Sequence, residues 1–367
     1  MDLEVLQENL SKALLITSRF VSSRAQLPVL ANILLVAGKT KLTVSATNLE
    51  TSASISLGSK IKEDGELTIP AKTFFEIVSN LMQGTIHLEA EKESLKITGS
   101  GFTGRISGMN SSDFPKVPQT IKKDESINLS KTEFLNALPQ VSFAASSDEG
   151  RPVLTGILFI LSKKSLSLVA TDGFRLSRKT ISLEGTGKEI KTIIPKNILL
   201  EVSRVGEENE NVLLDVKEKE KQIVFGLNNL ILSSRVLEGE FPDYEKIIPK
   251  NSSVKVRVDK EELLRAVKLS SVFARDSANI VKIKIMKDSI KLSAESSQVG
   301  NQETTIDAKV EGEPIEISFN YKFLEDFLRA VVGEEIIMEF NSTSSPGVFT
   351  DPKDPNFLHL IMPVKVQ

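Results

Sequence analysis

The chain has 367 residues, of which 40% are apolar and 26% charged, a composition typical of folded globular proteins of two or three domains. The absence of cysteine excludes disulfides and thiolate metal sites, and two histidines, His87 and His359, offer little for zinc binding or general-base catalysis. The net charge of −3 argues against a protein that holds nucleic acid by bulk electrostatic attraction.

The N-terminal stretch "MDLEVLQENL" lacks the basic and apolar character of a secretory leader, and no apolar run reaches about 18 residues. We therefore expect a cytoplasmic protein without a membrane span. We also expect neither a metal nor an organic cofactor, because no nucleotide-binding, metal-binding or nucleophile motif accompanies the chemistry-poor composition.

In chain order, the first predicted element is a helix over residues 6–23 that opens the chain. A strand and a helix follow over 66–81, where apolar residues three and four apart form one stripe. The alternating segment 84–99 predicts a hairpin with Glu91 and Lys92 in its turn. The same order of helix, strands, helix and strands recurs from residues 130–146 and 191–205, and again from 259–275 and 314–333.

The segment "GSGFTG" at residues 99–104 matches the glycine pattern of dinucleotide-binding loops. In that fold the last glycine opens a helix, whereas "RISGMNSSDFP" follows here and is too rich in Gly, Ser and Pro. A glycine-rich hairpin is the better prediction, and a dinucleotide enzyme remains a minor alternative.

The segment "LVATDGFRL" at residues 168–176 contains a carboxylate, Asp172, close to Arg175. Asp-Gly between two apolar runs is primarily a tight-turn signal, since Gly tolerates positive φ and Asp can accept bonds from its own backbone. The residues alone leave two interpretations open, a reactive carboxylate or a turn that presents side chains to a partner.

The sequence also repeats itself, which is the strongest indication of its architecture. Pro28, Leu30, Ala46 and Thr47 are matched by Pro152, Leu154, Ala170 and Thr171, each 124 positions later, and a third copy follows from residue 278. Proline-containing segments at 113–118 and 240–249 mark the joints. We therefore predict an α+β protein of three similar domains, residues 1–122, 123–250 and 251–367, each a duplicated helix-plus-sheet unit.

Nine ordered motifs resemble the bacterial beta sliding clamp family, the processivity subunits of replicative DNA polymerase. They are "LPVLANILL", "TIPAKTFFEIV", "SDFP", "RPVLTGILF", "VATDGFRLS", "IIPK", "EGEFPDYEKIIPKN", "FNYKFLEDFL" and "LIMPV", and together they span essentially the whole chain. The resemblance implies a head-to-tail homodimer that closes a ring of six domains, with helices lining the hole and sheets outside. It implies a DNA sliding clamp rather than an enzyme, one that encircles duplex DNA and binds it without sequence preference.

The resemblance further implies a hydrophobic pocket that receives peptide segments from the polymerase, the ATP-dependent clamp loader, repair polymerases and mismatch repair proteins. Carried over by motif, its residues are Leu154, Thr171, Gly173, Phe174, Arg175, Leu176, Pro242, Lys246, Ile247, Asn320, Phe323, Pro346, Leu360, Met362, Pro363 and Val364. On this reading Asp172 shapes the turn. Phe174 stands where many members have His, and Ala278 where some have an aromatic residue.

Basic residues recur on or beside the predicted helices, where scattered lysines ordinarily mark only the solvated face. By motif for Arg24, and by helix position for Lys72, Lys196 and Arg204, we predict contacts with DNA phosphates. By analogy, Ile106 in one copy and Val272 and Phe273 in the other form the dimer contact. A repeat scaffold that binds peptides but has no DNA role remains the alternative function.

Overall fold

The computed structural model describes residues 1–22, 27–183, 189–205 and 211–365. The chain divides into two compact units. Unit 1 contains Met1–Thr132 and Asn197–Val236, and unit 2 contains Glu133–Lys196 and Leu237–Gln367. The central third of the sequence is therefore shared between the units, so the domain boundaries expected from the repeat stay a prediction.

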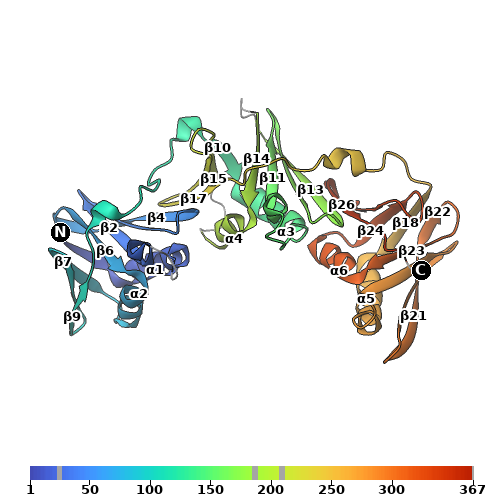
Figure 1. The fold of residues 1–367 in the computed structure, drawn as a ribbon, viewed down its shortest axis with the longest axis horizontal. Helices are drawn as coiled ribbons and strands as arrows, with labels where there is room; N and C mark the ends of the chain where they lie inside the picture. The colour runs from blue at the N-terminus through green and yellow to red at the C-terminus, as the bar shows by residue number, and fades with distance from the viewer. Residues whose placement is uncertain (23–26, 184–188, 206–210, 366–367) are drawn as a thin grey trace. The chain divides into compact units, whose positions relative to one another are not determined.

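Six α-helices occur among the described residues. They are α1 Gln7–Thr17, α2 Ala71–Asn80, α3 Lys131–Ser142, α4 Lys196–Arg204, α5 Lys260–Ala274 and α6 Tyr321–Ala330. In unit 1, α1 packs beside α2 and against β3 and β4, and in unit 2, α5 packs beside α6 and against β20 and β21 (Figure 1). The predicted stripes explain this packing, since Phe74 and Val78 of α2 and Leu324 and Phe327 of α6 are buried.

The strands of unit 1 form two antiparallel sheets. Their bounds are β1 Asp2–Leu6, β2 Asn32–Gly38, β3 Lys41–Thr47, β4 Thr51–Gly58, β5 Lys60–Glu63, β6 Gly65–Pro70, β7 Thr85–Glu91, β8 Ser94–Gly99, β9 Phe102–Ser107, β10 Ile127–Ser130, β15 Asn211–Lys217, β16 Gln222–Leu227 and β17 Leu230–Arg235. The five-stranded sheet has the order β5-β1-β7-β8-β9, and the eight-stranded sheet has the order β10-β15-β16-β17-β4-β3-β2-β6. The second sheet joins strands from the first and second sequence repeats through the β17–β4 pair.

Unit 2 repeats this plan with a nine-stranded and a four-stranded sheet. Its strands are β11 Gly156–Leu161, β12 Ser165–Thr171, β13 Arg175–Ser182, β14 Ile190–Pro195, β18 Val254–Asp259, β19 Ile280–Ile285, β20 Ser289–Ser296, β21 Gly300–Asp307, β22 Lys309–Glu311, β23 Ile315–Asn320, β24 Glu335–Phe340, β25 Gly347–Asp351 and β26 Asp354–Ile361. The sheet orders are β14-β11-β12-β13-β26-β25-β24-β18-β22 and β21-β20-β19-β23. Here the β13–β26 pair joins the second and third repeats.

A strand precedes each helix that was expected to open a repeat. β1, β10 and β18 lead directly into α1, α3 and α5, so the expectation that each repeat opens on a helix is wrong. These strands are only four to six residues long, and their alternation merges into the apolar spacing of the helix. The first helix is also shorter than expected, because α1 ends at Thr17 and a 3-10 turn, Ser18–Phe20, follows.

The "GSGFTG" segment forms a hairpin, as predicted. Gly99 ends β8 and pairs with Phe102 at the start of β9, and the two turn residues, Ser100 and Gly101, have φ values of 49° and 78°. The hairpin over 84–99 is also confirmed, but its turn lies one residue later than predicted: Glu91 still pairs with Ser94, and the turn residues are Lys92, where φ is 52°, and Glu93. The glycine pattern thus serves a tight turn and opens no helix.

Candidate functional site

The turn between β12 and β13 is held by its own side chains. The Oδ1 atom of Asp172 accepts hydrogen bonds from the N–H groups of Phe174 at 2.9 Å and Arg175 at 3.0 Å. The Thr171 hydroxyl donates to the Arg175 carbonyl at 2.6 Å and accepts from the Gly173 N–H at 3.1 Å. Gly173 has a φ of 94°, a value that glycine adopts without strain. Asp172 is therefore engaged in building the turn, as the turn interpretation requires.

The segment after β26 runs along this turn and continues onto a second sheet of unit 2. The Met362 N–H donates to the Phe174 carbonyl at 2.8 Å, and the Val364 N–H donates to the Ser318 carbonyl at 2.8 Å. These bonds hold residues 362–364, all three of them predicted site residues, beside the turn. The sequence motif "LIMPV" is thereby placed next to "VATDGFRLS".

An apolar cluster lies under this part of the surface. Its buried members include Leu154, Leu176 and Leu360, packed with Phe241 and Tyr244 of the proline-containing joint. Large apolar side chains stand exposed in the same set of segments: Phe174 is 60% exposed, Ile247 45% and Met362 37%. An exposed apolar group above a buried apolar floor is the kind of surface that binds protein segments.

The remaining predicted residues of this site differ in accessibility. Gly173, Pro242 and Lys246 are exposed, Thr171 is buried, and Arg175, Asn320, Phe323, Pro346, Pro363 and Val364 are half-buried. Lys246 forms a surface ion pair with Asp243 at 2.8 Å, which raises the pKa of Lys246 and lowers that of Asp243. Asn320 caps α6, because its Oδ1 atom accepts from the Lys322 N–H at 3.0 Å.

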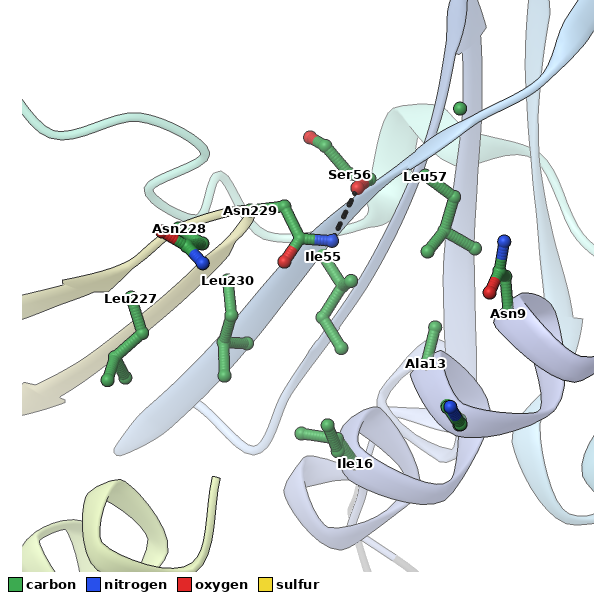
Figure 2. Close-up of a pocket in the computed structure, with 12 residues that line it drawn as sticks. Asn9, Ala13, Ile16, Ile55, Ser56, Leu57, Leu227, Asn228, Asn229 and Leu230 are labelled. Atoms are coloured by element: carbon green, nitrogen blue, oxygen red, sulfur yellow. Dashed lines mark hydrogen bonds between the residues drawn. The ribbon is translucent and has the colours of Figure 1, made fainter. Parts of the chain in front are cut away.

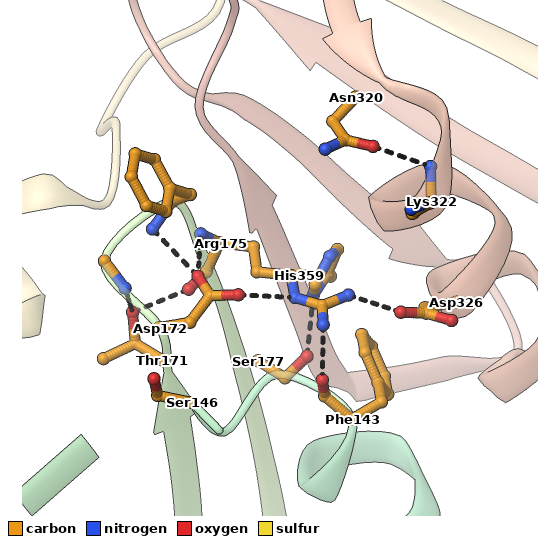
Figure 3. A network of polar contacts seen from close by, with 12 residues as sticks. Phe143, Ser146, Thr171, Asp172, Arg175, Ser177, Asn320, Lys322, Asp326 and His359 are labelled. Atoms are coloured by element: carbon orange, nitrogen blue, oxygen red, sulfur yellow. Dashed lines mark hydrogen bonds and ion pairs between the residues drawn. The ribbon is translucent and has the colours of Figure 1, made fainter. Parts of the chain in front are cut away.

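Arg175 is the most highly connected polar residue of the site (Figure 3). Its side chain is 11% exposed and reaches Asp172 at 3.0 Å, Asp326 at 2.6 Å and the Phe143 carbonyl at 2.7 Å. The guanidinium also lies 4.5 Å from the centre of the Phe323 ring and 5.4 Å from that of Phe143. Because all of its N–H-bearing edges have partners, Arg175 supports the turn and α6 from below.

The charge of Arg175 contributes to lowering the pKa of two further groups, His359 and Lys196. His359 is fully buried, shares a 2.6 Å hydrogen bond with the Ser177 hydroxyl and stacks on Phe327 at 5.2 Å between ring centres. Burial, and secondarily the Arg175 charge, hold the pKa of His359 well below its ordinary value. The same two causes lower the pKa of Lys196, with Asp326 opposing them. His359 is therefore a neutral structural residue.

The predicted DNA-contacting residues lie in different surroundings. Lys72 is exposed on α2. Lys196 is half-buried beside Arg175, a placement that favours a structural role over phosphate contact. Arg204 is 59% exposed at the end of α4 and pairs with Glu201 at 2.6 Å. Arg24 lies outside the described residues.

The predicted dimer residues lie in two places, on the edge strand β9 and near the end of helix α5. Ile106 is buried on β9, the last strand of the five-stranded sheet. Val272 is 48% exposed near the end of α5, and Phe273 packs partly against the core of unit 2. β21, which lies against α5, is likewise the last strand of the four-stranded sheet.

A hollow in unit 1 carries none of the predicted site residues. It has a volume of about 380 Å³ and lies between α1 and the β16–β17 turn (Figure 2). Its floor is apolar, from Ala13, Ile16 and Ile55, and Asn229 closes one side by donating to the Ser56 carbonyl at 2.9 Å.

The described residues include no group of three or more His, Cys, Asp or Glu that could hold a metal ion. In the same part of the chain, no helix is long and apolar enough to cross a membrane.

Sequence reasoning missed the partners that fix Arg175. Asp326 and Phe143 lie 151 and 32 positions away in the chain. Asp326 stands in the motif "FNYKFLEDFL" but was not singled out as a site residue, and Phe143 belongs to none of the motifs. Glu201, which contacts Arg204, was likewise not singled out. An acidic residue three positions before an arginine on a helix was the only local signal.

Three protein-family models match consecutive parts of the chain. They describe the N-terminal, central and C-terminal domains of the DNA polymerase III beta subunit and match residues 1–118, 128–243 and 245–365. The chain is 29% identical over 360 residues to the beta sliding clamp of Staphylococcus aureus, covering 95% of each protein. It superposes on the DNA polymerase sliding clamp of Bacillus subtilis with a TM-score of 0.95 at 27% identity, and on the DNA polymerase III beta subunit of Thermotoga maritima with 0.90 at 26%, covering 100% of each chain.

Proposed function

This chain belongs to the DNA polymerase III beta subunit family, and from that premise we propose that it acts as a DNA sliding clamp. It consists of three DNA clamp domains. As a processivity factor it keeps a DNA polymerase on its template by enclosing the duplex, and it needs no catalytic group of its own for that task. We place its work in the cytoplasm, where bacterial DNA is replicated.

The observation that carries this proposal is a strand pairing between neighbouring repeats. It is made twice within the chain, and the strands that would make it a third time have no partner at their outer edges among the described residues. Within the units, β4 pairs with β17 and β13 pairs with β26. By sequence spacing, β21 is the third copy of β4 and β13, and β9 corresponds to β17 and β26. Both β9 and β21 end their sheets.

A second copy of the chain supplies the pairing that completes this pattern. Antiparallel pairing of β9 of one copy with β21 of the other joins five strands to four, the same total as the nine-stranded sheet of unit 2. Such a head-to-tail contact, made twice, closes a homodimeric ring and covers the exposed β9 and β21 edges of both copies. Val272 and Phe273 on α5, which packs on β21, then lie near the contact with Ile106.

Enclosure makes weak DNA contacts sufficient. Duplex DNA carries a dense phosphate charge, and a protein that neutralises many phosphates binds tightly but moves poorly. A closed ring with a net charge of −3 per chain stays on the DNA because it encloses the duplex, and strong electrostatic attraction is not needed. Exposed basic residues such as Lys72 and Arg204 then serve as transient phosphate contacts, and base readout is not required.

Retention on circular DNA tests the enclosure. The protein loaded on a nicked circle is expected to persist at salt concentrations that strip charge-held proteins, and to leave once the circle is cut. Val272→Asp, which places a charge in the proposed contact, shortens retention, whereas Val332→Asp at another exposed apolar position is the control. Equal loss from circular and linear DNA excludes enclosure.

For the apolar surface around Phe174 and Met362, we propose a role in binding short apolar peptide segments. Polymerase subunits, the clamp loader and repair proteins are the proposed donors of such segments. Support comes from the exposed Phe174, Ile247 and Met362 above a buried apolar cluster. A methionine suits a surface with several clients because its side chain adapts to different shapes.

Peptide binding at this surface is tested with Met362→Ala. Removal of a contact side chain at an interface centre costs about 1–2 kcal/mol, so the dissociation constant for a polymerase tail peptide should rise roughly 5- to 30-fold. Met82→Ala, at a methionine that is 75% exposed in unit 1, should leave it unchanged. Unchanged affinity in the Met362 variant places the peptide site elsewhere.

A further inference from the structure

One carboxylate in unit 1 holds two arginines from different segments. Glu201 on α4 receives Arg19 at 3.0 Å on its Oε2 atom and Arg204 at 2.6 Å on its Oε1 atom. Arg19 belongs to the 3-10 turn that follows α1, and Arg204 is the last residue of α4. Both oxygens of Glu201 are therefore occupied by guanidinium groups from two directions.

Exposure differs between the carboxylate and the two cations. The Glu201 side chain is 18% exposed, whereas those of Arg19 and Arg204 are 38% and 59% exposed. Solvent, or an anion arriving from solvent, thus reaches the guanidiniums more readily than the carboxylate beneath them. The cluster carries a net charge of +1 instead of +2.

Given the proposed clamp function, on which this inference rests, we propose that Glu201 limits the grip of Arg19 and Arg204 on DNA phosphates. The carboxylate binds the Nη1 group of each arginine, so a phosphate that uses this group competes with an existing charge-assisted bond, and the nearby negative charge weakens the attraction of both guanidiniums for any phosphate. Arginine otherwise binds phosphate through two parallel bonds, which is a strong contact for a protein that must slide. Glu201 is a positioning residue that keeps these contacts brief.

The inference predicts a change in the salt dependence of DNA binding. Glu201→Gln retains the shape and can still accept hydrogen bonds, but it releases one unit of positive charge to the phosphates. One added phosphate contact steepens the plot of log K against log salt by about 0.9, which corresponds to about 8-fold tighter binding at 0.1 M salt. A purely structural role for Glu201 would not change this slope.

The control variant makes the same change of net charge on a strand. Glu316→Gln removes the carboxylate that pairs with Lys282 at 3.2 Å, and both groups lie on the four-stranded sheet. Binding of a short linear duplex is measured by fluorescence anisotropy from 50 to 200 mM salt for wild type and both variants. The plot of log K against log salt should be steeper than wild type for Glu201→Gln and should have the wild-type slope for Glu316→Gln.

Two results overturn the inference. A wild-type slope in Glu201→Gln shows that the carboxylate does not restrain the arginines, and weaker binding shows that it orients them for contact instead. Glu201→Asp, which keeps the charge, provides a second reading and should retain the wild-type slope. Retention of wild type on a nicked circle is measured in parallel, so that failure of enclosure is distinguished from failure of the restraint.

Discussion

Replacement of Arg175 by alanine tests whether the polar network supports the turn and α6. The wild-type guanidinium bonds to Asp172, Asp326 and the Phe143 carbonyl and lies over the Phe323 ring. Charge-assisted hydrogen bonds contribute about 1.5–3 kcal/mol each, but their sum overstates the loss, because the variant no longer desolvates a guanidinium. The Asp326 side chain is 42% exposed and Asp172 keeps two backbone N–H donors, so both carboxylates stay partly compensated, and we expect a loss of about 1.5–3 kcal/mol.

Native-state hydrogen exchange measures this loss locally, which avoids treating a protein of several domains as a single unfolding unit. The amides of β13 and β26 should open roughly 10- to 150-fold more often in Arg175→Ala, the equivalent of about 1.5–3 kcal/mol. Arg329→Ala is the matched control: Arg329 is 65% exposed and pairs with Glu325 at 2.5 Å, and its loss should leave these amides nearly unchanged. A change below about 1 kcal/mol in Arg175→Ala would contradict a supporting role.

Three other predictions test the fold of the chain. The depressed pKa of His359 means that the unfolded chain binds a proton below about pH 6.5 that the folded chain does not, so stability should fall by up to about 1.4 kcal/mol per pH unit below that value, down to the folded pKa; His359→Gln should remove this part of a pH-dependent denaturation series. Gly173→Ala forces a side chain into a φ of 94° and should destabilise by about 1–2 kcal/mol in urea unfolding, whereas Leu49→Gly relieves a residue at 77° and should not destabilise comparably. Phe349→Ala removes a fully buried ring that packs against three phenylalanine rings and the His359 ring, and it should cost about 3–5 kcal/mol in the same assay.

Local patterns predicted the elements that carry the site. The Asp-Gly signal gave the turn after β12, because the bonds that shape it involve only residues 171–175. The apolar spacing in "YKFLEDFLRA" gave α6, since Leu324 and Phe327 recur on one helical face and are buried. Each of these features depends on neighbours within about one helical turn or one hairpin.

Long-range partners could not be predicted from the same patterns. Arg175 stood in a recognised motif, yet nothing in the sequence pointed to Asp326 as its ion-pair partner or to the Phe143 carbonyl as its acceptor. Lys196 is a second example. A basic residue at the start of a helix is expected to be exposed, but Lys196 is half-buried next to Arg175. Such contacts depend on which strands meet across the repeats, and strand pairing is set by tertiary packing.

The two strand pairs that join neighbouring repeats, β4–β17 (the first joint) and β13–β26 (the second joint), share one backbone design. The turn after β3 repeats the bonds of the turn after β12: the Thr47 hydroxyl donates to the Thr51 carbonyl at 2.9 Å, and Asn48 accepts from the Glu50 and Thr51 N–H groups at 3.0 and 2.7 Å. The Arg235 N–H donates to the Glu50 carbonyl at 2.8 Å, as the Met362 N–H does to that of Phe174. Duplicated backbone geometry alone would therefore predict two peptide sites per chain.

The side chains at the two joints predict only one. Where Leu176 and Leu360 face each other across β13 and β26, the first joint has Ser52 and Ser233, whose buried hydroxyls bond to each other at 2.7 Å. A hydroxyl pair that satisfies itself offers no apolar floor, and an apolar peptide gains little by covering it. Isothermal titration with a polymerase tail peptide should therefore give one site per chain, and Leu360→Ser should weaken that site. A stoichiometry of two would show that the backbone of the joint, and not its apolar floor, determines where peptides bind.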